Sequence, residues 1–213
     1  MSKVTTETLG TGRLLLMSSA VSATAANLYY NQPILPKIGT ELGLTSAQLG
    51  AVPAASQIGY AVALLFLSPL GDTLPRKRLI AILSVMLVLS SFIAFSASSL
   101  IVLVVACFAI GLSANITQQL IPFAASLSTP ETKGKVIGTL MTGLTVGILL
   151  SRTLSGFVGE QFGWRAVFMM SASIAMIFGL MLYAFLPTNT PTIKIPYLKL
   201  VASMATLIKQ HSI

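Results

Sequence analysis

Six long stretches almost free of charged residues constrain this chain more than any other feature. They cover residues 14–36, 48–70, 78–97, 100–127, 136–159 and 165–186. An uncharged apolar run of about 18 or more residues is long enough to cross the hydrocarbon core of a bilayer as a helix. Only 8% of the 213 residues are charged, against about 25% in a soluble domain. The sequence therefore predicts an all-α membrane protein with six transmembrane helices.

The distribution of basic residues predicts how these helices are oriented. If the N-terminus is cytoplasmic, two basic residues face outward, Lys37 and Arg165, and Arg152 lies within a span. The other ten face inward: Lys3, Arg13, Arg76, Lys77, Arg78, Lys133, Lys135, Lys194, Lys199 and Lys209. An excess of Lys and Arg on the cytoplasmic side is the usual determinant of topology. The net charge of +8 therefore indicates cytoplasmic termini and not a nucleic-acid partner.

The chain is expected to divide into three parts. Residues 1–13 form a cytoplasmic N-terminal segment, residues 14–187 a six-helix transmembrane domain, and residues 188–213 a cytoplasmic linker. Within the linker, a helix over residues 197–210 would place its apolar side chains on one face, which is typical of a helix lying in the membrane interface. The alternative is a packing helix that awaits more chain. Both interpretations imply that the chain ends before its architecture is complete.

Two loops resemble each other and suggest an internal repeat. "GDTLPRK" at Gly71–Lys77 aligns without gaps to "GEQFGWR" at Gly159–Arg165, and a Leu-Ser pair precedes each. Repeats of inverted topology are a common feature of transporters, whose substrate sites lie at the repeat interface near the bilayer midplane. We therefore expect the six helices to form a 3+3 inverted repeat.

Polar side chains recur near the middle of the first, second and fourth spans. They are amides and phenols: Asn27, Tyr30, Asn31, Gln57, Tyr60, Asn115, Gln118 and Gln119. If the first span is one helix, its members share about a third of the circumference. An unpaired amide in hydrocarbon costs several kcal/mol, so these groups must meet protein or water. We expect them to line a substrate cavity, although hydrogen bonds between helices would also satisfy them.

Arg152 and a row of small residues distinguish the fifth span. A charge at this depth costs roughly 2.5–3.5 kcal/mol, so Arg152 is a candidate functional residue. The alternatives are that it extends toward the interface or pairs with Glu160. The small residues recur every four positions and favour close approach of another helix. They are Gly143, Gly147, Ser151, Ser155 and Gly159.

No motif in the chain indicates an enzyme, a cofactor or a metal site. Cys107 is the single cysteine, which excludes a thiolate metal cluster. No phosphate-binding loop and no zinc-type Cys/His spacing is present. Catalytic, metal-binding and cofactor-binding residues are therefore not expected.

The segment "LSPLGDTLPRKRLI" resembles the loop motif G-x-L-A-D-R-x-G-R-K of the major facilitator superfamily. Leu70, Asp72, Arg76 and Lys77 match this motif, whereas Thr73 replaces an arginine. "NLYYNQPILP" and "GILLSRTLSGFVGEQFGWRAVF" are similar to the bacterial arabinose-efflux-permease-like branch, whose members include drug:proton antiporters. Members have twelve helices in two halves, and this chain is similar to the N-terminal half.

The resemblance implies a secondary transporter of the bacterial inner membrane that works by alternating access. It would export a small sugar-like or drug-like solute against proton entry, and it would be incomplete without a second six-helix half. By resemblance, Asp72 would secure the cytoplasmic gate against that half, while Arg76 and Lys77 anchor the loop. The row of small residues in the fifth span would face a partner surface that this chain lacks.

The expected partners are a small solute, protons, the lipid bilayer and a second six-helix half. Amides and phenols suit hydroxylated or weakly polar solutes, and Arg152 would attract an anionic group. One alternative is a half-size carrier that dimerises through the small residues of its fifth span. Another is a membrane scaffold or remnant that transports nothing.

Overall fold

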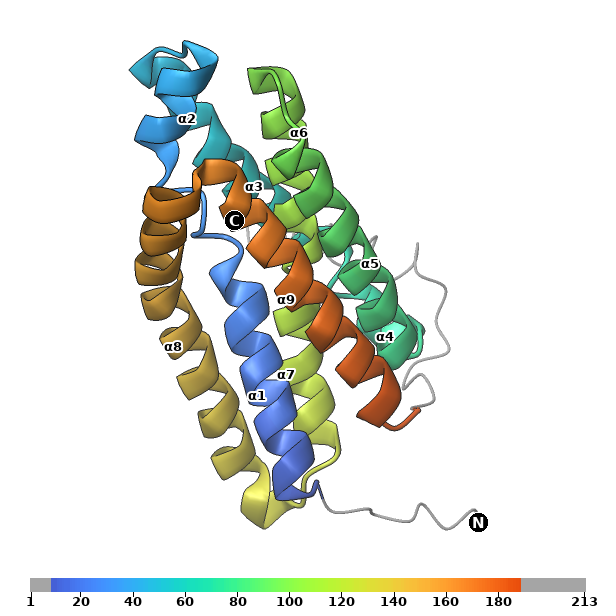
Figure 1. Cartoon of the computed structure of the whole chain (residues 1–213). Helices are drawn as coiled ribbons and strands as arrows, with labels where there is room; N and C mark the ends of the chain where they lie inside the picture. Colours follow the sequence, from blue (N-terminus) through green and yellow to red (C-terminus); the bar gives the residue numbers. More distant parts are fainter. Residues whose placement is uncertain (1–8, 189–213) are drawn as a thin grey trace, which may run out of the picture.

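The computed structural model describes residues 9–188, which form nine helices and no strands (Figure 1). The helices are α1 (Thr11–Ala26), α2 (Leu35–Leu42), α3 (Ser46–Phe66), α4 (Leu70–Thr73), α5 (Arg76–Phe95), α6 (Leu100–Ser113), α7 (Ile116–Ser126), α8 (Pro130–Phe162) and α9 (Trp164–Phe185). Five segments are long and apolar enough to cross a membrane: Ser46–Thr73, Arg76–Phe95, Leu100–Ser126, Pro130–Phe162 and Trp164–Phe185. The helix predicted over residues 197–210 lies outside the described residues.

The prediction of one continuous helix over residues 14–36 is wrong. Helix α1 has 16 residues and ends at Ala26, and turns occupy residues 27–34 before α2 begins. Pro33 lies within these turns and Pro36 in the first turn of α2, where the missing N–H and fixed φ of proline are tolerated. The N–H of Leu28 instead bonds the carbonyl of Ala25 at 3.2 Å, as in a tighter 3₁₀-type turn. The polar residues of this block therefore do not share one helical face.

The helix of the first block packs against that of the fifth, and the helix of the fourth block packs against that of the second. Helix α1 packs along α8, α3 packs along α6, and α5 packs along α9 (Figure 1). Both of the first two contacts bring backbones together at a glycine. A Cβ added at Gly147 would lie 2.7 Å from Ser22 Cα, and one added at Gly111 would lie 2.9 Å from the carbonyl carbon of Ser56. Small residues are what allow membrane helices to approach this closely.

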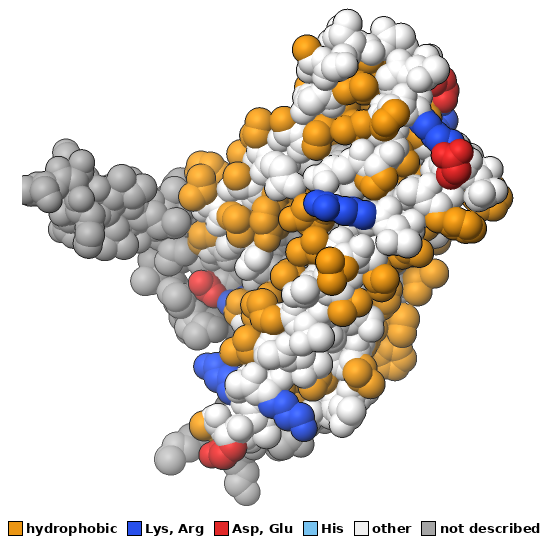
Figure 2. Space-filling view, turned by 90° about the vertical axis from the view of Figure 1, so that its left-hand side faces the viewer, with side chains coloured by type: hydrophobic (Ala, Val, Ile, Leu, Met, Phe, Trp, Pro, Cys, Tyr) orange, Lys and Arg blue, Asp and Glu red, His pale blue; other side chains and the backbone are white. Residues whose placement is uncertain are grey.

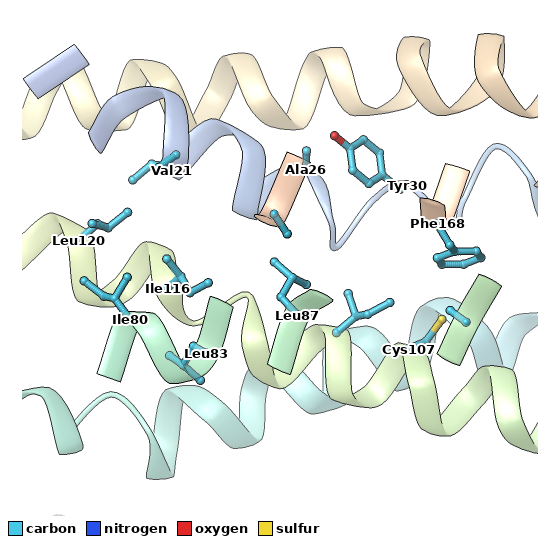
Figure 3. Packing of buried hydrophobic residues seen from close by; sticks show 14 of the residues in the cluster. Val21, Ala26, Tyr30, Ile80, Leu83, Leu87, Cys107, Ile116, Leu120 and Phe168 are labelled. Carbon is cyan, nitrogen blue, oxygen red and sulfur yellow. The ribbon is translucent and has the colours of Figure 1, made fainter. Parts of the chain in front are cut away.

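The apolar core extends through the whole bundle, and part of it lies where α7 packs against α1 and α5. Leu83 and Leu87 of α5, Leu120 of α7 and Val21 of α1 are almost fully buried and pack together (Figure 3). On the outside, hydrophobic side chains cover the middle of the face in Figure 2, and most of its charged side chains gather near the two ends. This is the surface expected of a protein whose middle lies in hydrocarbon.

A clamp of charged and aromatic side chains fixes α2 to the start of α9. Glu41 accepts a hydrogen bond from Trp164 Nε1 at 2.6 Å and pairs with Arg165. Arg165 also stacks on Trp164, 4.1 Å from its ring centroid, and donates to the carbonyl of Ala97 at 2.8 Å. The hydrogen bonds from Arg165 and then from Trp164 lower the pKa of Glu41. A second pair, Lys37 with Glu160 at 3.0 Å, ties α2 to α8.

Candidate functional site

Two amides of the first block are buried and hydrogen-bonded to neighbouring helices. Asn27 Nδ2 donates to the carbonyl of Ala23 at 2.8 Å, and its Oδ1 accepts from Ser171 of α9. Asn31 Nδ2 donates to Ser56 of α3 at 2.9 Å. Both asparagines are at most 5% exposed. These contacts are those of residues that join helices.

Asn115 and Gln119 hold the loop between α3 and α5. Asn115 Nδ2 donates to Ser68 Oγ at 2.9 Å, and Gln119 Nε2 donates to Asn115 Oδ1 at 3.0 Å. Gln119 packs so tightly on Gly71 that an added Cβ would lie 3.0 Å from the Gln119 amide carbon. Both amides are fully buried, so they support the loop from within the bundle.

The predicted gating residues lie in this same loop. Asp72 of α4 forms an ion pair at 2.6 Å with Arg76, the first residue of α5. Lys77 Nζ donates to the carbonyl of Leu186 at 2.7 Å, and so caps the end of α9. Its Nζ also lies 5.3 Å from the ring centroid of Tyr183. Arg76 and Lys77 thus attach the loop to the rest of the domain through contacts that the chain itself supplies.

A mainly apolar pocket of about 260 Å³, with a few polar side chains in its wall, opens between α1, α3, α7 and α8. Gln118 Nε2 donates to Tyr60 Oη at 2.7 Å, and this pair joins α7 to α3 at the wall of the pocket. Both side chains are only partly buried. Tyr29 also lines the pocket, whereas its neighbour Tyr30 does not. Unlike the buried asparagines, this group has polar atoms that a solute could reach.

Two further predicted residues continue this face toward the end that carries α2. Gln57 precedes Tyr60 on α3 by three residues, and Arg152 follows the pocket residue Ile148 on α8 by four. Since α3 and α8 run in opposite directions, both positions lie about one turn from the pocket on the same side. Both side chains are exposed. Within residues 9–188 no acidic group pairs with Arg152, and Glu160 pairs with Lys37 instead.

The small residues of α8 face α1 of the same chain, which corrects the expectation that they await another half or a second copy. Ser151 and Ser155 are fully buried, and a Cβ at Gly159 would lie 2.5 Å from Ile34. Gly143 and Gly147 are likewise closed by Ser18 and Ser22. A long row of small residues indicates a close helix contact but does not say whether its partner comes from the same chain.

Sequence reasoning missed Tyr29, because a continuous helix would have pointed it away from Tyr60. The available signal was the pair of prolines at 33 and 36, which predicts that the helix ends before them. In the turns that replace the helix, adjacent side chains diverge. Tyr29 and Tyr30 thus come to line two different cavities.

Residues 15–206 match the sequence profile of the Major Facilitator Superfamily. The chain belongs to the major facilitator superfamily. Its relatives include an uncharacterized transporter, YgaY, of Escherichia coli O157:H7, which is 36% identical over 94% of this chain and 51% of its own length. A probable transporter of Streptomyces coelicolor is 30% identical over 83% of this chain and 41% of its own length. The chain spans about half the length of such relatives, and it is a multi-pass membrane protein of a transporter family.

Two further comparisons extend this result. The purine ribonucleoside efflux pump NepI of Escherichia coli is 24% identical over 68% of this chain and 37% of its own length. Among solved structures, the bacterial homolog of the human lysosomal transporter Spinster, in an inward-facing and unoccupied conformation, has a TM-score of 0.73. It shares 19% identity and covers 86% of this chain and 44% of its own chain. That likeness shows the fold.

Proposed function

We propose that the chain supplies the N-terminal half of a secondary transporter that exports a small solute by alternating access, driven by proton entry across the inner membrane. In this proposal both termini are cytoplasmic, and a second six-helix half completes the carrier. The single observation that carries it is the accessible Tyr60–Gln118 pair, with Arg152 exposed nearby at membrane depth. A helix face that carries these groups costs too much to be turned toward lipid.

The six-span arrangement follows if α1 and the turns after it, up to the start of α2, together make one broken span. The proposed repeats are then α1–α5 and α6–α9. In support, the first span of each packs against the second span of the other, α1 on α8 and α6 on α3, while the third spans α5 and α9 pack together. In each cross-pair the second span also presents a glycine to the backbone of the first span, Gly147 of α8 to Ser22 of α1 and Gly59 of α3 to Phe108 of α6. This exchange is what a 3+3 repeat with twofold symmetry would produce.

The solute contacts are divided between two groups in this proposal. Tyr29, Tyr60 and Gln118 contact the solute, and Gln57 and Arg152 lie along its path. The buried residues Asn27, Asn31, Asn115 and Gln119 act indirectly by holding the helices that carry the contact residues. Tyr30 faces a separate groove. Phenols and a carboxamide suit a hydroxylated or weakly polar solute, in keeping with a pocket of small volume.

The experiment is a transport assay in vesicles, with an imposed proton gradient, on the carrier formed by this chain together with its second half. Radiolabelled nucleosides, sugars and uncharged drugs are the probes. Gln118→Ala should lower the transport rate of an accepted solute at least tenfold, while Tyr183→Phe, at an exposed position outside the pocket, should leave it unchanged. Collapse of the proton gradient should stop accumulation. Equal rates for Gln118→Ala and the parent would refute the site, and accumulation without a gradient would refute proton coupling.

A further inference from the structure

A second and larger groove, of about 630 Å³, lies between α1, α8 and α9. In Figure 1, α1 is seen between α8 and α9, where this groove runs. Seven hydroxyl-bearing residues line it: Ser18, Ser19, Ser22, Tyr30, Thr139, Thr142 and Ser151. None of its described lining residues is charged. It shares no residue with the pocket beside Tyr60.

Tyr30 places a hydrogen-bonding group in this groove without giving it a partner. The residue is only 3% exposed, and its hydroxyl makes no hydrogen bond with any residue in the described part of the chain. Figure 3 shows the phenol oxygen pointing away from the labelled core residues of α5 and α7. The fully buried side-chain atoms without a hydrogen-bond partner in the described chain are Asn31 Oδ1 and Gln119 Oε1, so the Tyr30 oxygen is not fully enclosed. An occupant of the groove can therefore accept a hydrogen bond from Tyr30.

The position of Tyr30 along the groove follows from the contacts of α1 with α8. Gly143 faces Ser18, Gly147 faces Ser22 and Gly159 faces Ile34, so equivalent positions differ by 125 residues. Tyr30 is therefore level with Ser155, close to Leu154 at the far end of the lining residues. The opposite end is at Thr139. The rise of an α-helix makes this distance along α8 roughly 22 Å.

The shape and depth of the groove restrict what can fill it. Both of its ends lie well inside α8, and the lining residues Val146, Leu150 and Leu154 are 42–51% exposed. The groove is therefore open along one side, and its exposed rim is apolar, as is typical of a helix face in contact with hydrocarbon. Phe178 and Ile174 of α9 form its apolar wall. An occupant must be long, mainly apolar and uncharged, because no side chain is present to neutralise a charge at that depth.

We propose that this groove binds one elongated, uncharged amphiphile from the bilayer, of the chemical class of a long-chain alcohol. Its oxygen accepts a hydrogen bond from Tyr30, and its chain runs toward Thr139 between the walls of α8 and α9. The site is independent of solute transport through the pocket beside Tyr60. The consecutive tyrosines 29 and 30 thus serve two different ligands.

Photolabelling of the protein in phospholipid nanodiscs tests the proposal. The probe is a long-chain alcohol with a diazirine in its chain, and the labelled peptides are identified by mass spectrometry. Labels should concentrate on the groove-lining segments of α1, α8 and α9, and excess unlabelled alcohol should remove most of them. An alkane of equal length should compete at least tenfold less well, since it cannot accept from Tyr30.

Two pairs of variants separate a site from general contact with lipid. Tyr30→Phe keeps the ring and should lower specific labelling about tenfold, while Tyr29→Phe should leave it within twofold. Val146→Trp fills the groove from an exposed position and should abolish specific labelling, while Val105→Trp, exposed on α6, should not. Three results would each overturn the proposal. They are labelling spread evenly over all exposed helices, equal competition by the alkane, and unchanged labelling of both the Tyr30→Phe and the Val146→Trp variants.

Discussion

Two faces of α8 differ in whether the polar groups that they border are buried or accessible. Toward α1, the helix presents glycines and fully buried serines, and the two backbones touch. Toward α3 and α7, it borders a pocket whose amide and phenols remain accessible, and Arg152 continues that face without a partner in the described chain. The first face uses small and polar residues to hold the bundle together. We interpret the second as the face that meets the solute.

The largest effect should follow from breaking the close contact. Gly147→Leu would drive its side chain into the backbone of Ser22, so we expect a loss of about 3 kcal/mol in the free energy of unfolding. Reversible unfolding in mixed micelles measures it. Gly138→Leu, on the same helix with no atom within 4 Å of an added Cβ, is the control. A stable Gly147→Leu protein would mean that the α1–α8 contact is looser than described.

A smaller loss should follow from removing a buried amide. Asn115→Ala leaves Ser68 Oγ without its donor and Gln119 Nε2 without one of its acceptors, and a buried polar group left unpaired costs about 2 kcal/mol. Gln57→Ala removes an exposed amide and should change the free energy of unfolding by less than about 0.5 kcal/mol. The same unfolding assay compares the two. Equal losses would erase the distinction between supporting and accessible amides.

Tyr60→Phe tests the accessible polar group at the pocket, in contrast to the buried amide Asn115. It deletes the hydroxyl that accepts from Gln118 in a partly exposed pair, so the loss of stability should be about 0.5–1 kcal/mol. Its effect on solute affinity, measured by binding of a solute accepted in transport, should be larger than its effect on unfolding. The opposite ranking would assign Tyr60 to packing.

The smallest effect concerns the clamp of α2. The pKa of Glu41 is lowered in the folded protein by Arg165 and Trp164, so its stabilising contribution is complete above the ordinary pKa of glutamate, near 4.5. That contribution is lost as the pH falls through the lowered pKa. The protection of α2 against hydrogen exchange, relative to the intrinsic exchange rate at each pH, should therefore decrease at acidic pH, and Glu41→Gln should remove most of that pH dependence. Pairs as exposed as this one stabilise little.

The sequence predicted the helical class because long apolar runs dictate it, and it predicted which spans carry polar groups. It could not predict which amides are satisfied. Asn115 and Gln118 lie three residues apart, yet one is enclosed by Ser68 and the other meets Tyr60 at a pocket. That difference depends on how α7 rotates against α3, which a pattern along one chain does not contain. Pro33 and Pro36 point to a break in the first block, but Pro53 and Pro122 lie inside α3 and α7, so proline alone does not determine where a helix ends.

The destination of the small residues on α8 could not be predicted either. Their spacing of four places them on one face of the helix, where another helix can approach closely, but the spacing does not say which helix packs there. The match between Gly143, Gly147 and the backbone of Ser18 and Ser22 is a property of the assembled pair. A sequence pattern therefore indicates which kind of partner can pack on a helix face, and the topology of the bundle determines which helix packs there.

Cysteine accessibility in the intact membrane tests the central claim most directly. In a Cys107→Ala background, Gln118→Cys, Ser151→Cys and Leu89→Cys are treated with a water-soluble, charged maleimide, and the labelling rates are compared. If the face of α3, α7 and α8 lines an aqueous path, Gln118→Cys should react at least tenfold faster than both the buried Ser151→Cys and the lipid-facing Leu89→Cys. Labelling of Gln118→Cys no faster than that of Leu89→Cys would contradict the account.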